Sequence, residues 1–87
     1  MSNRKYTEDQ QTDLYRTATW EQVQALKFEL KQARTAQAKA SRKMHTQGGS
    51  EATKGWMDAL EYKTNISTTY GIALMGYQNR QKAARGY

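Results

Sequence analysis

The most regular pattern along the chain is a run of seven positions that starts at Val23 and ends at Met44. Its spacings alternate between three and four residues, which is typical of a helix that packs through one narrow face. The positions are apolar or small, with one glutamine among them: Val23, Leu26, Leu30, Ala33, Gln37, Ala40 and Met44. Lysine and arginine occupy the opposite face, so we predict an amphipathic helix that ends near residue 46.

The first half of the chain carries two signals for the start of a helix. A threonine followed three residues later by a glutamine, the spacing of a capping box, occurs at Thr7–Gln10 and again at Thr19–Gln22. Two arrangements are consistent with this pattern. Either one helix runs over about residues 8–46, or a short helix over 8–17 precedes a long helix over 20–46, with a bend at the two threonines between them.

The second half repeats the helical pattern with larger side chains, over about residues 51–84. Apolar residues at helical spacings share one face: Trp56, Leu60, Ile66, Tyr70, Ala73, Leu74 and Tyr77. The β-branched run at residues 66–70 is also typical of a strand. A single strand would have no partner in this chain and would leave an exposed edge. We therefore predict a helix there, with Gly71 and Gly76 as its weak points.

These elements predict an all-α fold in a single domain over residues 1–87. Two antiparallel helical arms form a hairpin around a glycine turn at 47–50, and a short basic tail follows the second arm. A short extra N-terminal helix is the alternative for the first arm. An 87-residue chain buries only about 60–65% of its unfolded surface, and no disulfide is available. We therefore expect oligomerisation or docking on a partner to stabilise the fold.

Charge is unevenly distributed along the chain. The net charge is +6, and residues 31–43 contain five basic side chains and no acidic one, while residues 70–87 add three more. Clustered cations bind nucleic acid by releasing its counterions, although they also stabilise helix ends and keep a small protein dissolved. The candidate nucleic-acid contacts are Lys31, Arg34, Lys39, Arg42, Lys43, Arg80, Lys82 and Arg85. In an antiparallel hairpin they form two separate patches.

Several large apolar residues lie away from the two stripes. Trp20 and Phe28 fall among Lys27 and Lys31 on the helical wheel. Either residues 1–18 fold back and cover Trp20 and Phe28 with Leu14 and Tyr15, or Trp20 and Phe28 are anchors for another subunit. One hairpin cannot bury both faces of both helices, which favours a protein partner or self-association. The candidate interface residues are Trp20, Phe28, Tyr62, Ile72 and Met75, and Met57 raises the same question.

Few residues are suited to catalysis or to metal binding. Cysteine is absent, His45 is the single histidine, and the glycines form no phosphate-binding loop. We therefore predict no enzyme activity, cofactor, metal or small-molecule substrate.

The expected location follows from hydrophobicity. No apolar run approaches the roughly 20 residues that cross a bilayer, and the N-terminus lacks the apolar core of a signal peptide. We expect no membrane contact, and a location in the cytoplasm or within a virion assembled in the host cytoplasm.

The function predicted from these features is structural. The chain has the character of an assembly protein, a small phage or viral particle component whose basic helix faces lie near nucleic acid. One alternative is a free nucleic-acid-binding protein without sequence preference, and another is a small helical inhibitor or adaptor that docks on a host protein. Direct phosphate binding weakens steeply with ionic strength, which separates the first alternative from apolar docking.

Overall fold

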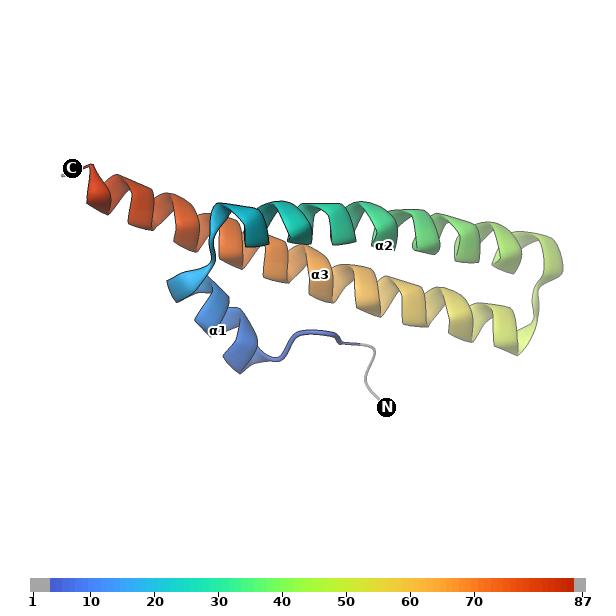
Figure 1. The fold of residues 1–87 in the computed structure, drawn as a ribbon. Coiled ribbons are helices and arrows are strands. Elements are labelled where there is room, and N and C mark those ends of the chain that lie inside the picture. The colour runs from blue at the N-terminus through green and yellow to red at the C-terminus, as the bar shows by residue number, and fades with distance from the viewer. Residues whose placement is uncertain (1–3, 86–87) are drawn as a thin grey trace.

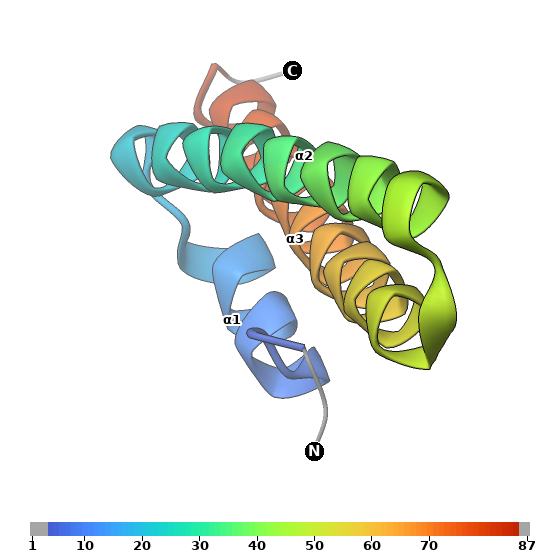
Figure 2. The same ribbon diagram turned by 90° about the vertical axis from the view of Figure 1, so that its right-hand side faces the viewer.

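A computed structural model describes residues 4–85, and this part of the chain is all-helical, as expected (Figure 1). Its three helices are α1 over Glu8–Thr17, α2 over Trp20–Gln47 and α3 over Gly49–Ala84. α2 and α3 pack against each other and run in opposite directions, and α1 packs on α3 rather than on α2 (Figures 1 and 2). The last two residues of the predicted basic tail lie outside the described residues.

The break between α1 and α2 decides between the two arrangements of the first arm. Both capping boxes are present. In the first, the Gln10 backbone N–H donates to the Thr7 hydroxyl at 3.2 Å, and the Thr7 backbone N–H donates to the Gln10 side chain at 2.8 Å. In the second capping box, the Gln22 backbone N–H donates to the Thr19 hydroxyl at 3.2 Å, and the Thr19 backbone N–H donates to the Gln22 side chain at 2.9 Å. Ala18 between the helices is extended, with φ −60° and ψ 131°. The chain therefore forms a short helix followed by a long one.

The reversal between α2 and α3 takes place within two glycines. Gly48 has φ 68° and Gly49 has φ 88°. Residues other than glycine rarely adopt a backbone conformation with positive φ. α2 ends at Gln47 and α3 begins at Gly49, two residues before the predicted start of the second arm.

The core lies between α2 and α3, on the stripes expected from the sequence. On α2, Val23, Leu26, Leu30 and Ala33 are buried, while Gln37, Ala40 and Met44 are half-buried. On α3, Ile66 and Ala73 are fully buried, and Trp56, Leu60, Tyr70, Leu74 and Tyr77 are half-buried. The β-branched run is helical throughout. Burial is greatest in the half of the molecule away from the glycine turn, because Leu14 and Ala18 join the core there.

The C-terminal end of α1 reaches the backbone of α3 at Gly76. A Cβ atom at this position would overlap the Tyr15 carbonyl group, so only glycine permits the approach. Arg80 donates its guanidinium N–H groups to the carbonyl oxygens of Tyr15 and Ala18, at the end of α1 where carbonyls lack helical partners. Asn79 donates to the Tyr15 hydroxyl at 2.8 Å. The end of α1 is thus held by backbone packing and by two side chains of α3.

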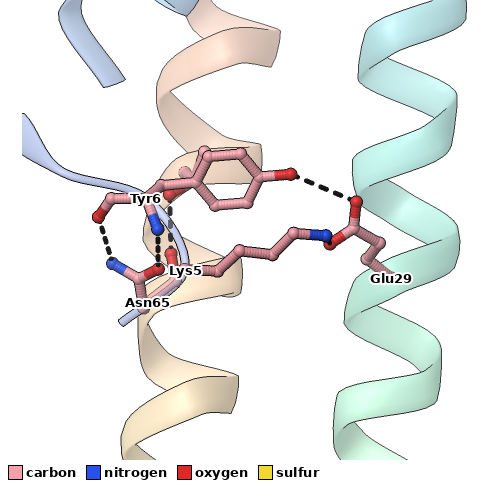
Figure 3. Close-up of polar contacts among 5 residues, drawn as sticks. Lys5, Tyr6, Glu29 and Asn65 are labelled. Atoms are coloured by element: carbon pink, nitrogen blue, oxygen red, sulfur yellow. Dashed lines mark hydrogen bonds and ion pairs between the residues drawn. The ribbon is translucent and has the colours of Figure 1, made fainter. Parts of the chain in front are cut away.

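The segment before α1 ties α3 to α2 (Figure 3). The Asn65 side chain accepts from the Tyr6 N–H at 2.9 Å and donates to the Tyr6 carbonyl at 3.0 Å. The Tyr6 hydroxyl donates to one Glu29 oxygen at 3.1 Å, and the Lys5 ammonium donates to the other at 2.8 Å. Tyr6 therefore joins α3 through its backbone and α2 through its side chain.

A further buried contact lies along α3 between Asn65, which holds Tyr6, and Gly76, which meets the end of α1. The Gln11 side chain donates to the Thr69 hydroxyl at 2.9 Å, and this hydroxyl donates to the backbone carbonyl of Asn65 at 2.7 Å. Both Asn65 and Thr69 are buried, and no buried side-chain polar atom in the described part of the chain lacks a partner. One face of α3 thus receives the N-terminal segment through four positions that the apolar pattern did not identify: Asn65, Thr69, Gly76 and Arg80.

A methyl group at position 76 tests the backbone contact. Gly76→Ala should lower the free energy of unfolding by about 1–3 kcal/mol, because the added Cβ forces α1 away from α3. Gly55→Ala is the matched control: Gly55 is exposed in the same helix with open space around it, and alanine there should stabilise by about 0.5–1 kcal/mol. Urea unfolding followed by circular dichroism measures both. Equal stability of Gly76→Ala and the wild type would contradict the close approach.

The contacts around Glu29 predict a loss of stability at alkaline pH. Burial, reinforced by the Glu29 carboxylate, raises the pKa of Tyr6 above 10.0, and the hydrogen bond to Glu29 raises the pKa of Lys5 above 10.5. Both groups hold their protons more tightly in the folded chain, so their contribution is present below these values and disappears as pH rises through the folded pKa values. We expect the free energy of unfolding to fall above about pH 10. Tyr6→Phe should show a shallower fall in pH-dependent urea titrations, and an identical slope would be inconsistent with this origin.

Candidate functional site

The described residues contain no metal-binding cluster and no membrane-spanning helix. No group of three or more His, Cys, Asp or Glu side chains between residues 4 and 85 could hold a metal ion. No helix in that range is both long and apolar enough to cross a membrane. His45 is exposed in the last turn of α2. The candidate sites are therefore the outer faces of the helices and the grooves between them.

The basic cluster predicted between positions 31 and 43 is exposed on α2. Its members form no ion pair with any described side chain: Lys31, Arg34, Lys39, Arg42 and Lys43. Glu29 is the nearest acid along the helix, and it is engaged by Lys5 at 2.8 Å. The positive charge of this part of α2 is thus not neutralised within the described part of the chain.

The second predicted basic group differs from the first in its contacts. Arg80 is half-buried and holds the end of α1, whereas Lys82 and Arg85 are exposed at the end of α3. Figure 1 places the C-terminal end of α3 far from the turn, whereas residues 31–43 lie in the half of α2 that leads into the turn. Arg80 therefore has a structural role that the sequence did not indicate.

Trp20 and Phe28 are exposed on α2. Trp20 has an exposed fraction of 51%, and its ring packs against the Tyr77 ring with centroids 5.4 Å apart. Phe28 has an exposed fraction of 60%. The described part of the N-terminal segment docks on α3, where Leu14 joins the core and Tyr15 contacts Asn79. The alternative in which Leu14 and Tyr15 cover these two rings is therefore wrong, and the alternative in which the rings are anchors for another subunit stays a prediction.

A shallow groove of about 570 Å³ lies beside Phe28, between α2 and α3. It is lined by Gln24, Lys27, Phe28, Leu30, Lys31, Arg34 and Tyr70, and none of these is acidic. Four of them were not among the candidate site residues: Gln24, Lys27, Leu30 and Tyr70. Lys27 lies just outside the acid-free run, and Leu30 and Tyr70 were assigned to the core stripes. Three cations and two aromatic rings around one groove suit a negatively charged ligand with flat apolar parts.

A second groove of about 930 Å³ has the opposite chemical character. It lies between the segment before α1 and the first half of α3, and its lining includes Tyr6, Trp56 and Leu60. Glu8, Asp58 and Glu61 also line it, with Arg4. The two grooves therefore favour different ligands.

The candidate interface residues of α3 do not lie on one surface. Tyr62 and Ile72 are half-buried, whereas Met75 has an exposed fraction of 59% and Met57 one of 57%. Eighteen residues separate Met57 and Met75, about five helical turns, so they share one side of α3. Glu61 and three small residues, Thr64, Thr68 and Gly71, are exposed on the same side between them. We call the uncharged part of this side, Thr64, Thr68, Gly71 and Met75, the α3 outer face. From residue 64 to residue 79 the chain contains no charged side chain.

Comparison with known proteins gives no function to transfer. No protein-family model, curated protein or solved structure matches the chain. Two chemically distinct outer surfaces remain: the basic, aromatic side of α2 and the uncharged α3 outer face.

Two substitutions on α2 separate a surface ring from a core residue. Phe28→Ala should leave the free energy of unfolding nearly unchanged, because the ring is mostly exposed. Leu30→Ala should lower it by about 2–5 kcal/mol, because Leu30 is buried in the seam. Thermal or urea unfolding measures both, and a large loss for Phe28→Ala would place that ring in the core instead.

Proposed function

We propose that this protein is a non-enzymatic assembly component whose two helical arms form an antiparallel hairpin that self-associates through the α3 outer face. The observation that carries this proposal is an exposed helix face without charge. Thr64, Thr68, Gly71 and Met75 follow spacings of four, three and four residues, which is the pattern of a helix-packing seam. Exposed helix faces of monomeric proteins normally carry charged residues.

A second copy of the chain is the partner that fits this face best. Gly71 is exposed, with open space where a Cβ would lie, so another helix can approach closely at this point. A two-fold interface places the same surface on both subunits. Two copies of an uncharged face can pair without charge repulsion, whereas two copies of the basic side of α2 would repel each other.

The overall dimensions support a partner as well. The accessible surface is 6499 Å², whereas a compact monomer of 10.0 kDa exposes about 5,200 Å². The radius of gyration is 15.9 Å, whereas a compact domain of this length has about 12 Å. The isolated chain is thus more extended, and exposes more surface, than a compact monomer of the same mass.

The separation of the two surfaces suits a particle component. Protein contacts use the α3 outer face, while the unneutralised cations of α2 stay free to lie near nucleic acid. We therefore propose that the protein is a component of a phage or viral particle assembled in the host cytoplasm. A free nucleic-acid-binding protein is the second candidate, and the acid-free groove beside Phe28 favours it.

Light scattering of the purified protein tests self-association. The wild-type mass should rise from 10.0 kDa towards twice that value with concentration. Met75→Asp should keep the protein monomeric, because pairing would bury an uncompensated carboxylate. Gln32→Asp is the control, since it makes the same change of charge at an exposed position on α2. A wild-type mass of one chain at every concentration, or equal dimerisation of Met75→Asp, would contradict the proposal.

A further inference from the structure

Aromatic rings and cations share one exposed surface of α2. Trp20, Lys27, Lys31 and Arg34 are separated by seven, four and three residues, so they form one stripe along the helix. Phe28 stands beside this stripe. At 1.5 Å per residue the stripe extends over about 21 Å. We call these five residues the α2 basic–aromatic face.

We propose that the α2 basic–aromatic face binds single-stranded nucleic acid. The cations contact successive phosphates, and unpaired bases stack on the rings of Phe28 and Trp20. This inference rests on the proposed function for the location of nucleic acid near α2, and it adds the strandedness of the ligand and the residues that bind it.

The charge of the face points to a polyanion. Lys27, Lys31 and Arg34 make no ion pair with any described side chain, and no acidic residue lines the groove between them and Tyr70. α2 carries two acidic residues: Glu29 already accepts from Lys5 and Tyr6, and Glu21 is exposed next to Trp20 at the start of the helix. A polyanion that binds here gains contacts with three cations without breaking an existing ion pair.

The exposed rings point to unpaired bases rather than to a duplex. Stacking on an aromatic side chain needs the flat face of a base, which a duplex covers with neighbouring base pairs. Phe28 exposes 60% of its surface between two lysines, so a base on the ring keeps its phosphates within reach of both ammonium groups. Trp20 is held by the Tyr77 ring and still exposes 51% of its surface. An acidic peptide would also contact the cations, but it would leave no reason for two exposed rings beside them.

Fluorescence anisotropy with labelled oligothymidylate measures binding to the full-length protein. Phe28→Leu keeps an apolar side chain of similar size but removes the ring, and it should weaken binding at least about fivefold. Phe28→Tyr keeps the ring and should bind like the wild type. Lys31→Gln should make the dependence of log affinity on log salt concentration shallower by about 0.7, from a wild-type slope of about −2 for three phosphate contacts. Lys54→Gln, at an exposed position on α3, should leave affinity and slope nearly unchanged.

Three results would overturn the site. Equal affinity of Phe28→Leu and the wild type would exclude stacking. Equal affinity for a duplex of the same length would exclude selection of unpaired bases. Displacement of the oligonucleotide by polyglutamate at equal charge concentration would assign the face to an acidic protein. Melting temperatures of all variants, followed by circular dichroism, confirm that each one is folded.

Light scattering of the same variants separates this inference from the proposed function. Phe28→Leu and Lys31→Gln should dimerise like the wild type. Loss of dimerisation together with intact oligonucleotide binding removes the assembly proposal alone. Intact dimerisation without oligonucleotide binding removes the nucleic-acid site alone.

Discussion

Backbone packs directly on backbone where α1 meets α3 at Gly76, and the placement of the outer faces depends on this contact. Because position 76 has no side chain, the Tyr15 carbonyl lies against α3, and Arg80 donates to the carbonyls of Tyr15 and Ala18 at the end of α1. Leu14 and Ala18 then join the core at this end of the molecule. With α1 held on α3, nothing in the described part of the chain covers the outer side of α2.

The polar residues on the inner side of α3 make this arrangement specific. A buried amide or hydroxyl without a partner costs about 1–3 kcal/mol, so any packing that left Asn65 or Thr69 unpaired would be disfavoured. Asn65 finds both of its partners on the backbone of Tyr6, and Thr69 accepts from Gln11. The N-terminal segment is therefore an integral layer of the fold. It satisfies polar groups that apolar side chains of α2 would leave unpaired.

Docking α1 on α3 leaves two exposed surfaces with different chemistry. The side of α2 that faces solvent carries unpaired cations around exposed aromatic rings, and the α3 outer face carries methionine, threonine and glycine without charge. A polyanion and an uncharged helix therefore have separate places to bind. This division is what allows one short chain to contact another protein and a nucleic acid at the same time in the function we propose.

The sequence by itself determined the helical pattern, the candidate caps, the glycine turn and the two core stripes, because these depend on residues within one or two turns of each other. The threonine–glutamine pairs indicated two possible helix starts and left open whether the first arm is one helix or two, and the alternating spacing from Val23 predicted the buried side of α2. Only the tertiary structure decided that α1 lies on α3, that Arg80 holds its end, and that Phe28 stays exposed. The Asn65–Tyr6 pair joins residues 59 positions apart. Periodicity along a helix reports which side is apolar, but it carries no information about which distant backbone a polar side chain or a glycine will meet.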